Sequence, residues 1–173
     1  MGSFISFVPT PFEDIDNFFK LAPVSAKDVV YDLGSGDGRL VLAALDMGAG
    51  RAVGVELDPT LIHRAQLRAR QNGVEDRVQF LHADVMDVDL SPATVVLCYL
   101  ITAASNALKP KFEAELKPGT RVVMESFPVH GWKPVETRGE YKVFYLYCMP
   151  PEPSGPEDQP RLGEEYFNYG YEY

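Results

Sequence analysis

The stretch VVYDLGSGDGR, residues 29–39, decides the fold of this chain. Its apolar start at 29–31 predicts a strand. The three glycines that follow predict a tight turn, because glycine tolerates positive φ and the close approach of a ligand. Over residues 40–45, apolar side chains recur with the spacing of one helix face. Such a helix begins with unpaired N–H groups, so the stretch predicts a ligand-binding loop that can seat an anionic group.

Strands and helices alternate along the rest of the chain, which is the pattern of a parallel sheet covered by helices. We expect strands at residues 28–33, 52–56, 78–81, 93–99 and 121–124, and helices at 11–21, 39–47, 59–71 and 108–116, the last with Pro110 as a candidate breakpoint. Two further segments, 133–137 and 141–148, predict a closing hairpin. The expected fold is therefore α/β: a seven-stranded, mostly parallel sheet with helices on both faces and a C-terminal antiparallel hairpin.

The length of 173 residues fits one domain with one core. We assign residues 1–149 to that domain, with an N-terminal segment and helix at 4–22 and the core at 28–149. From residue 150 the composition changes to proline, acids and tyrosine. This predicts an extended tail over 150–173 that is either solvated or docked on a groove.

Charge and hydropathy exclude several classes of partner. The net charge is −9, of which −5 falls in residues 150–173. Neither part of the chain offers a basic field to a phosphate backbone, so we expect no nucleic acid partner, whereas a lysine-rich protein fits. No window holds the roughly 18 apolar residues of a membrane span, and the N-terminus lacks the layout of a signal peptide. We therefore expect a cytoplasmic protein without a membrane partner; the sequence does not indicate an oligomeric state.

The two cysteines, Cys98 and Cys148, both lie in apolar runs that resemble strands. This predicts buried free thiols in a reducing compartment. Neither has a histidine or cysteine nearby at metal-binding spacing, so we expect no metal site.

Acidic residues follow the predicted strands in sequence order: Asp32, Asp37, Glu56 and Asp84. The carboxyl ends of parallel strands form the ligand crevice of such sheets, so these acids should meet there. The glycines read G-x-G-x-G, which departs from the dinucleotide pattern G-x-G-x-x-G, and acids would repel a pyrophosphate. They would instead favour the sulfonium and ammonium groups of S-adenosyl-L-methionine, while helix amides take its carboxylate. Glu56 suits two ribose hydroxyls, and Asp84 and the Val85 N–H suit the adenine.

At this point the chain resembles a known family. The motifs VYDLGSGDGR, GVELDP, HADV and LKPG, within residues 29–148, are similar to those of class I S-adenosylmethionine-dependent methyltransferases. More narrowly, VPTP (8–11), ATVVLCYL (93–100), LKPKFEAELKPGTRVV (108–123) and GW (131–132) resemble the small archaeal and bacterial protein-lysine methyltransferases. These are relatives of the ATP-synthase c-subunit lysine methyltransferases and, more distantly, of Dot1-type histone-lysine methyltransferases. The resemblance implies a Rossmann-like fold and methyl transfer to lysine ε-amines of protein substrates with accessible lysines.

The resemblance also implies a set of site residues. It places Thr10 and Pro11 over the cofactor, and Tyr99 and Leu100 beside the methyl group. Together with the glycine loop and the acids, the expected cofactor-binding residues are Thr10, Pro11, Asp32, Leu33, Gly34, Ser35, Gly36, Asp37, Gly38, Glu56, Leu57, Asp84, Val85 and Tyr99. The expected walls of the substrate channel are Tyr99, Leu100, Phe127 and Trp132, although the aromatic residues among them could equally pack in the core.

Two features depart from the family pattern or receive no role. Ser35 stands where family members commonly have cysteine, and the tyrosine-rich tail is not part of the pattern. Glu125 and Ser126 are assigned no role.

Methyl transfer from a sulfonium is an in-line displacement that needs a neutral amine. An apolar channel lowers the pKa of a lysine, and proximity supplies much of the acceleration, so no catalytic base is assigned. The loop Cys98-Tyr99-Leu100-Ile101 lacks the Asn/Asp-Pro-Pro-aromatic sequence of enzymes that methylate the amino groups of bases. Two alternatives stay open: a small-molecule methyltransferase, and a cofactor-binding protein without activity.

Overall fold

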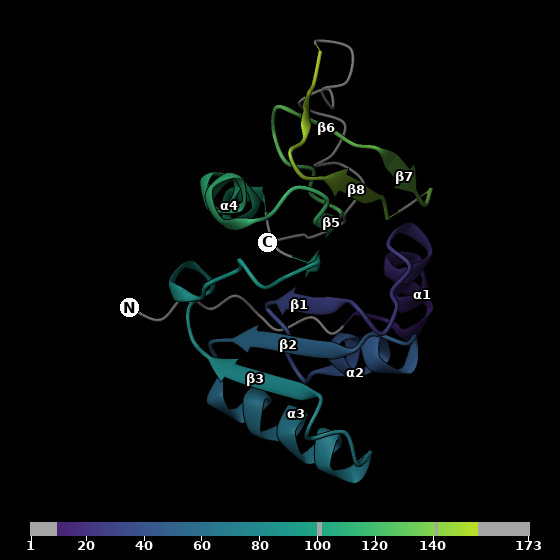
Figure 1. The fold of residues 1–173 in the computed structure, drawn as a ribbon, viewed down its shortest axis with the longest axis vertical. Coiled ribbons are helices and arrows are strands. Elements are labelled where there is room, and N and C mark those ends of the chain that lie inside the picture. The colour runs from purple at the N-terminus through teal and green to yellow at the C-terminus, as the bar shows by residue number, and fades with distance from the viewer. Residues whose placement is uncertain (1–9, 100–101, 141, 156–173) are drawn as a thin grey trace, which may run out of the picture.

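The computed structural model describes residues 10–99, 102–140 and 142–155. Seven strands form one sheet in the order β3-β2-β1-β4-β5-β8-β7 (Figure 1). Their bounds are β1 Val29–Leu33, β2 Arg51–Glu56, β3 Val78–His82, β4 Val95–Cys98, β5 Arg121–Glu125, β7 Glu136–Arg138 and β8 Phe144–Cys148. Strands β1 to β5 are parallel, and β8 runs antiparallel to both β5 and β7. The predicted sheet and its C-terminal hairpin are therefore confirmed.

Helices cover both faces of this sheet. The α-helices are α1 Phe12–Leu21, α2 Arg39–Asp46, α3 Pro59–Gln71 and α4 Thr102–Glu115, and one 3₁₀ turn, η1, spans Val85–Asp87. Local sequence fixes the start of α3, because the Asp58 side chain accepts a hydrogen bond from the Thr60 N–H at 2.7 Å and Pro59 occupies the first turn.

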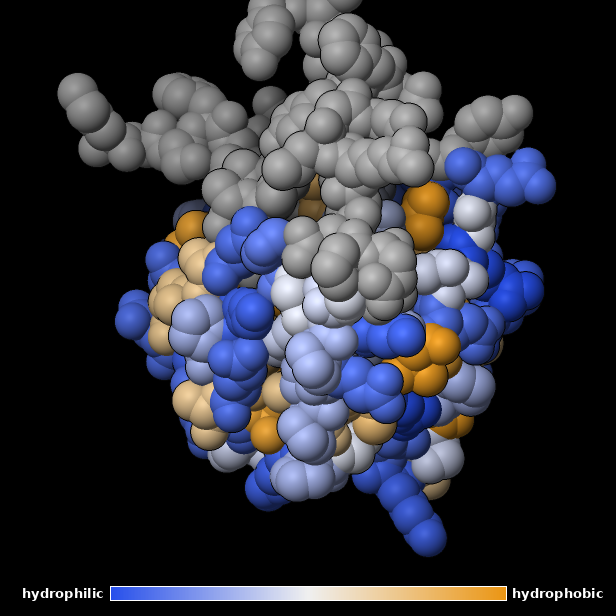
Figure 2. Space-filling view, turned by 90° about the horizontal axis from the view of Figure 1, so that it is seen from above, coloured by the Kyte–Doolittle hydropathy of each residue, from blue (hydrophilic) through white to orange (hydrophobic). Residues whose placement is uncertain are grey.

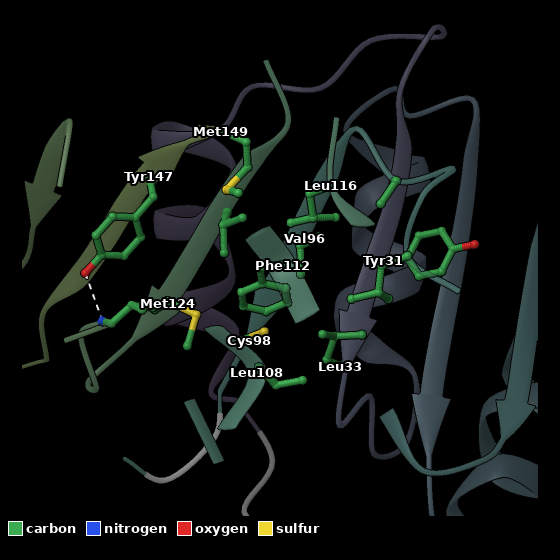
Figure 3. Packing of buried hydrophobic residues seen from close by; sticks show 14 of the residues in the cluster. Tyr31, Leu33, Val96, Cys98, Leu108, Phe112, Leu116, Met124, Tyr147 and Met149 are labelled. Atoms are coloured by element: carbon green, nitrogen blue, oxygen red, sulfur yellow. Dashed lines mark hydrogen bonds between the residues drawn. The ribbon is translucent and has the colours of Figure 1, made fainter. Parts of the chain in front are cut away.

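Two apolar clusters hold the layers together. One lies between the sheet and α4 and is filled by residues such as Leu33, Phe112 and Tyr147 (Figure 3). There the Tyr147 hydroxyl accepts a hydrogen bond from the Val129 N–H at 3.1 Å, which satisfies a buried polar group. The other cluster packs α1 and α2 on the opposite face, where the ring of Phe18 meets that of Phe144 edge-on.

The segment after β5 departs from the predicted hairpin. Its first strand is β7, which begins at Glu136, so the predicted strand 133–137 is wrong at its start. Trp132–Lys133 instead form β6, which pairs antiparallel with β9, Glu152–Pro153, in a separate two-stranded sheet. Pro134 explains the break, because it has no N–H to donate and separates the two short strands.

Three smaller expectations also changed or were refined. Helix α4 begins at Thr102 rather than 108 and continues through Pro110, where the loss of one N–H is tolerated. Cys98 is a buried free thiol as predicted, but Cys148 is exposed. Within the described ranges, no helix is long and apolar enough to cross a bilayer. The face in Figure 2 is mainly hydrophilic, with apolar residues scattered over it. The division into a domain at 1–149 and a tail stays a prediction.

Candidate cofactor and substrate site

The carboxyl ends of the five parallel strands meet at one edge of the sheet. The register pairs Leu33 of β1 with Val55 of β2 on one side and with Cys98 of β4 on the other. Cys98 pairs in turn with Met124 of β5. The strand order reverses between β1 and β4, and in open α/β sheets such a switch point is where a ligand binds.

The glycine loop after β1 is tied to β2 by its backbone. Its glycines have φ values of 86°, 52° and 78° at Gly34, Gly36 and Gly38, in the region that favours glycine. The N–H groups of Gly34 and Ser35 both donate to the Val55 carbonyl at 2.9 Å. A Cβ at Gly38 would lie only 2.7 Å from that of Ala65, so this position also needs glycine for space.

Glu56 fixes the loop from the end of β2. Its Oε2 accepts a hydrogen bond from the Gly36 N–H at 2.9 Å. Its Oε1 accepts from the N–H groups of Leu57 at 2.7 Å and Asp58 at 3.0 Å. These three bonds orient the carboxylate at the crevice, which is compatible with the predicted ribose contact; the contact itself stays a prediction.

The adenine-side residues lie where the sequence places them, at the exit of β3. The exposed Asp84 caps η1, because its Oδ1 accepts a hydrogen bond from the Met86 N–H at 2.9 Å. Val85 begins η1, and the Ala83 N–H bonds to the Glu56 carbonyl at 3.2 Å, which joins this turn to the end of β2. The neighbouring Leu57 is 62% exposed.

Asp37 is an internal brace of the loop. The Arg39 guanidinium donates to it twice, at 3.0 and 2.8 Å, and Arg68 Nη1 lies 2.8 Å from its Oδ2. Burial alone would raise the pKa of Asp37, but the two arginines hold it below its usual value. The expectation that this carboxylate offers free negative charge to the cofactor is therefore wrong, since two cations already balance it.

Asp32 is the acid whose charge is not balanced. It is 5% exposed, and within the described part of the chain no ion pair involves it. Burial, with the charges of Glu56 and Asp37, raises the pKa of Asp32 to about 8. A bound cation would relieve this, so the site fits the sulfonium and ammonium groups of S-adenosyl-L-methionine better than a pyrophosphate.

The N-terminal residues are anchored to the same loop. Arg39, which braces Asp37, donates from Nη1 to the carbonyl of Thr10 at 3.0 Å. Thr10 is buried, and Pro11 lies directly before α1. The structure thus places both beside the glycine loop; their contact with the cofactor stays a prediction.

The expected channel walls separate into different environments. Tyr99 and Phe127 are half-buried and follow β4 and β5, at the edge where the crevice lies. Trp132 is 4% exposed and packs between Phe112 and Tyr147, with its indole N–H donating to Glu113. It fills the core under α4, so its assignment as a channel wall is wrong. Leu100 lies outside the described residues.

Glu125, to which sequence reasoning gave no role, ends β5 at this edge. Its residue is fully buried, and Lys142 Nζ lies 3.8 Å from Oε1. Burial raises the pKa of Glu125 to about 7; the charge of Lys142 opposes the rise and that of Asp14 adds to it. The signal in the sequence was an acid closing an otherwise apolar strand, RVVME.

Comparisons with known proteins agree with this geometry. A family model of the ANTKMT methyltransferase domain matches residues 32–136. A protein-lysine N-methyltransferase of Saccharolobus islandicus (strain REY15A) is 44% identical over 151 residues, which are 84% of this chain and 94% of that protein. The lysine N-methyltransferase of Homo sapiens that is named for the ATP synthase c-subunit is 35% identical over 136 residues, which are 79% of this chain but only 58% of that protein.

A solved structure covers nearly the same part of the chain. The crystal structure of an RNA methyltransferase from Salinibacter ruber, in complex with S-adenosyl-L-homocysteine, superposes with a TM-score of 0.80 and 39% identity. The match covers 88% of this chain and all of that one. The chain thus belongs to the ANTKMT methyltransferase family, and it is a methyltransferase that uses S-adenosyl-L-methionine.

Proposed function

We propose that this enzyme transfers methyl groups to the ε-amines of lysines in proteins. The observation that carries the proposal is the 44% identity with a protein-lysine N-methyltransferase over 94% of that protein's length. The site supports it, since an acid-lined edge suits a cationic cofactor and a substrate that arrives as an ammonium. The overall charge of −9 also favours lysine-rich partners.

The residues of this chain would bind the cofactor and prepare the amine. When bound, S-adenosyl-L-methionine supplies a methyl group on a sulfonium, which an amine lone pair can displace. Asp32 would balance the cofactor's positive charge, and Glu56 would accept from its ribose hydroxyls. Tyr99 and Phe127 would exclude water from the incoming lysine, which lowers the pKa of its amine. Alignment of the amine with the methyl group then supplies much of the rate.

Incubation with a methyl-labelled donor and a lysine-rich protein mixture tests the proposal. We expect label on lysine side chains, mapped by mass spectrometry of the digested proteins. The matched control is Glu56→Ala, which should label the same sites more slowly because it loses cofactor affinity. Label confined to small metabolites would support the small-molecule alternative. No transfer to any acceptor would support a cofactor-binding protein without activity.

RNA methylation is a second candidate, because the Salinibacter ruber structure is described as an RNA methyltransferase. The charge of −9 counts against it, since a phosphate backbone is bound by basic surfaces. Adding total RNA to the same assay decides between them. Label on RNA and none on lysine would replace the first proposal by this one.

A cytoplasmic location also belongs to this proposal. Cys98 and Cys148 are both free, which suits a reducing compartment. Fractionation of cells that express the protein, with detection by antibody, is the measurement that checks it.

A further inference from the structure

Glu125 is a buried acid that the fold leaves without a hydrogen-bond partner. It is 0% exposed, and neither carboxylate oxygen accepts a hydrogen bond from a residue that the structure describes. Lys142 Nζ lies at 3.8 Å, within ion-pair distance but too far for a hydrogen bond. Burying a carboxylate in this way is costly, and such groups in native proteins indicate a missing partner.

Lys142 is committed to a different acid. Its Nζ donates to Oδ2 of Asp14, on α1, at 2.8 Å. Burial alone would lower the pKa of Lys142, but the hydrogen bond to Asp14 and the charges of Glu125, Asp14 and Tyr99 raise it. The Glu125 cluster, which we define as Asp14, Lys142 and Glu125, therefore holds two carboxylates and one ammonium. One further positive charge would balance it.

The Glu125 cluster lies at the edge of the sheet where the acceptor is expected. Cys98 of β4 pairs with Met124 of β5, so Tyr99 and Glu125 are the next residues on neighbouring strand ends. The charge of Tyr99 acts on Lys142, which also places the half-buried Tyr99 near the cluster. An amine that passes Tyr99 toward the methyl group would thus come close to Glu125.

We propose that the carboxylate of Glu125 binds the ε-ammonium of the target lysine and orients it in the site. This rests on the proposed function, since only an amine substrate supplies the required charge. An ammonium can donate to both Oε1 and Oε2, which satisfies the two buried oxygens together. It also brings the Glu125 cluster to two positive and two negative charges.

The same carboxylate can take the proton that the lysine must lose. The N–H bond breaks, an O–H bond forms on Glu125, and the nitrogen keeps the electron pair that attacks the methyl carbon. With the pKa of Glu125 raised to about 7, this transfer is better matched than to an ordinary carboxylate. The titratable groups that face Glu125 from α1, from the end of β4 and from the segment before β8 are Asp14, Tyr99 and Lys142.

The test is Glu125→Gln, which keeps the shape of the side chain and removes its charge. The substrate is a peptide that contains the lysine labelled by the wild-type enzyme. We expect KM for this peptide to rise at least about tenfold, while calorimetry shows cofactor affinity unchanged within about twofold. The wild-type kcat/KM for the peptide should increase as pH rises through about 7, and the variant should lack this increase. Asp28→Asn, an ion-paired acid before β1 at the opposite edge of the sheet, is the matched control and should keep the wild-type KM and pH profile.

Several results would overturn the proposal. An unchanged KM, a rise that Asp28→Asn reproduces, or a parallel loss of cofactor affinity would each reduce Glu125 to a structural residue. If Glu125→Gln does not fold, Glu125→Asp takes its place: a raised KM with the pH dependence retained supports the assignment, and a wild-type KM overturns it. A wild-type enzyme that labels no lysine overturns the proposed function as well. One that labels lysine with a KM indifferent to Glu125→Gln overturns only the present inference.

Discussion

Replacing Asp32 by asparagine removes a buried carboxyl group and nearly conserves its shape. The structure raises the pKa of this group from 3.8 to about 8. A carboxyl whose folded pKa is raised contributes full stability below its unfolded pKa, and this contribution is lost as pH rises through the folded value. From about pH 5.5 to pH 8 the native protein holds a proton that the unfolded chain has released. At 1.36 kcal/mol per unit, the wild type should lose about 3 kcal/mol more unfolding free energy than Asp32→Asn over that range.

Denaturant unfolding of both proteins at several pH values, without cofactor, measures this difference. In thermal melts it corresponds to a Tm gap that widens by about 6 to 12 °C for a domain of this size. Contributions from other acids such as Glu125 are present in both proteins and cancel. The control is Asp28→Asn: hydrogen bonds from Thr94 and Ser25 and the Arg121 charge lower the pKa of Asp28 despite its burial, so this variant should lose stability at neutral pH. Parallel pH curves for wild type and Asp32→Asn would refute the reasoning, because Asp32 would then titrate as an ordinary carboxyl.

The cofactor adds a second readout for the same change. A cation beside Asp32 favours its ionised form, so binding at pH 7 should release protons from the wild type. Calorimetry in two buffers of different ionisation enthalpy detects this release. The asparagine variant should release fewer protons and bind S-adenosyl-L-methionine about tenfold or more weakly, although it is the more stable protein at high pH. Equal proton release by both proteins would contradict the placement of Asp32 beside the cofactor's charge.

Other substitutions separate packing from binding. Gly38→Ala should cost about 2 to 4 kcal/mol of unfolding free energy, because it combines a positive φ with a clash. Gly73→Ala, with positive φ but open space, should cost only about 1 kcal/mol; equal costs in denaturant melts would exclude the clash. Trp132→Ala should lose about 3 to 5 kcal/mol of stability with little change in cofactor affinity, and a selective rise in substrate KM would instead restore it as a channel wall. Asp37→Asn should lower Tm through loss of its pairing with Arg39 and loosen the loop, seen as faster amide exchange at the glycines; wild-type exchange would contradict its bracing role.

Local signals in the sequence predicted most of the fold. The glycine turn, the Asp58-Pro59 helix start and the acid at the end of β2 each act within a few residues, and each lies where expected. The β6–β9 pair could not be predicted in the same way. It joins segments about twenty residues apart, and two-residue strands leave no periodic pattern.

The site residues that were misjudged depend on distant partners. The charge of Asp37 is balanced partly by Arg68, which lies on another helix. The role of Trp132 depends on how α4 packs, and Glu125 becomes notable only because Asp14 and Lys142 meet beside it across 128 residues of sequence. A pattern read along one strand identifies an acid at its end, but only the tertiary fold decides whether that acid is paired, solvated or left for a ligand.

The central claim is that carboxylates at the carboxyl edge of the sheet hold S-adenosyl-L-methionine. Calorimetric titration of the wild type, Glu56→Ala and Asp84→Ala with this cofactor tests it most directly. Both variants should stay folded, because both side chains lie at strand exits outside the apolar clusters. Their affinities should fall at least about tenfold, as expected for the loss of hydrogen bonds to a charged acceptor. Wild-type affinity in both folded variants would contradict the assignment of this edge as the cofactor site.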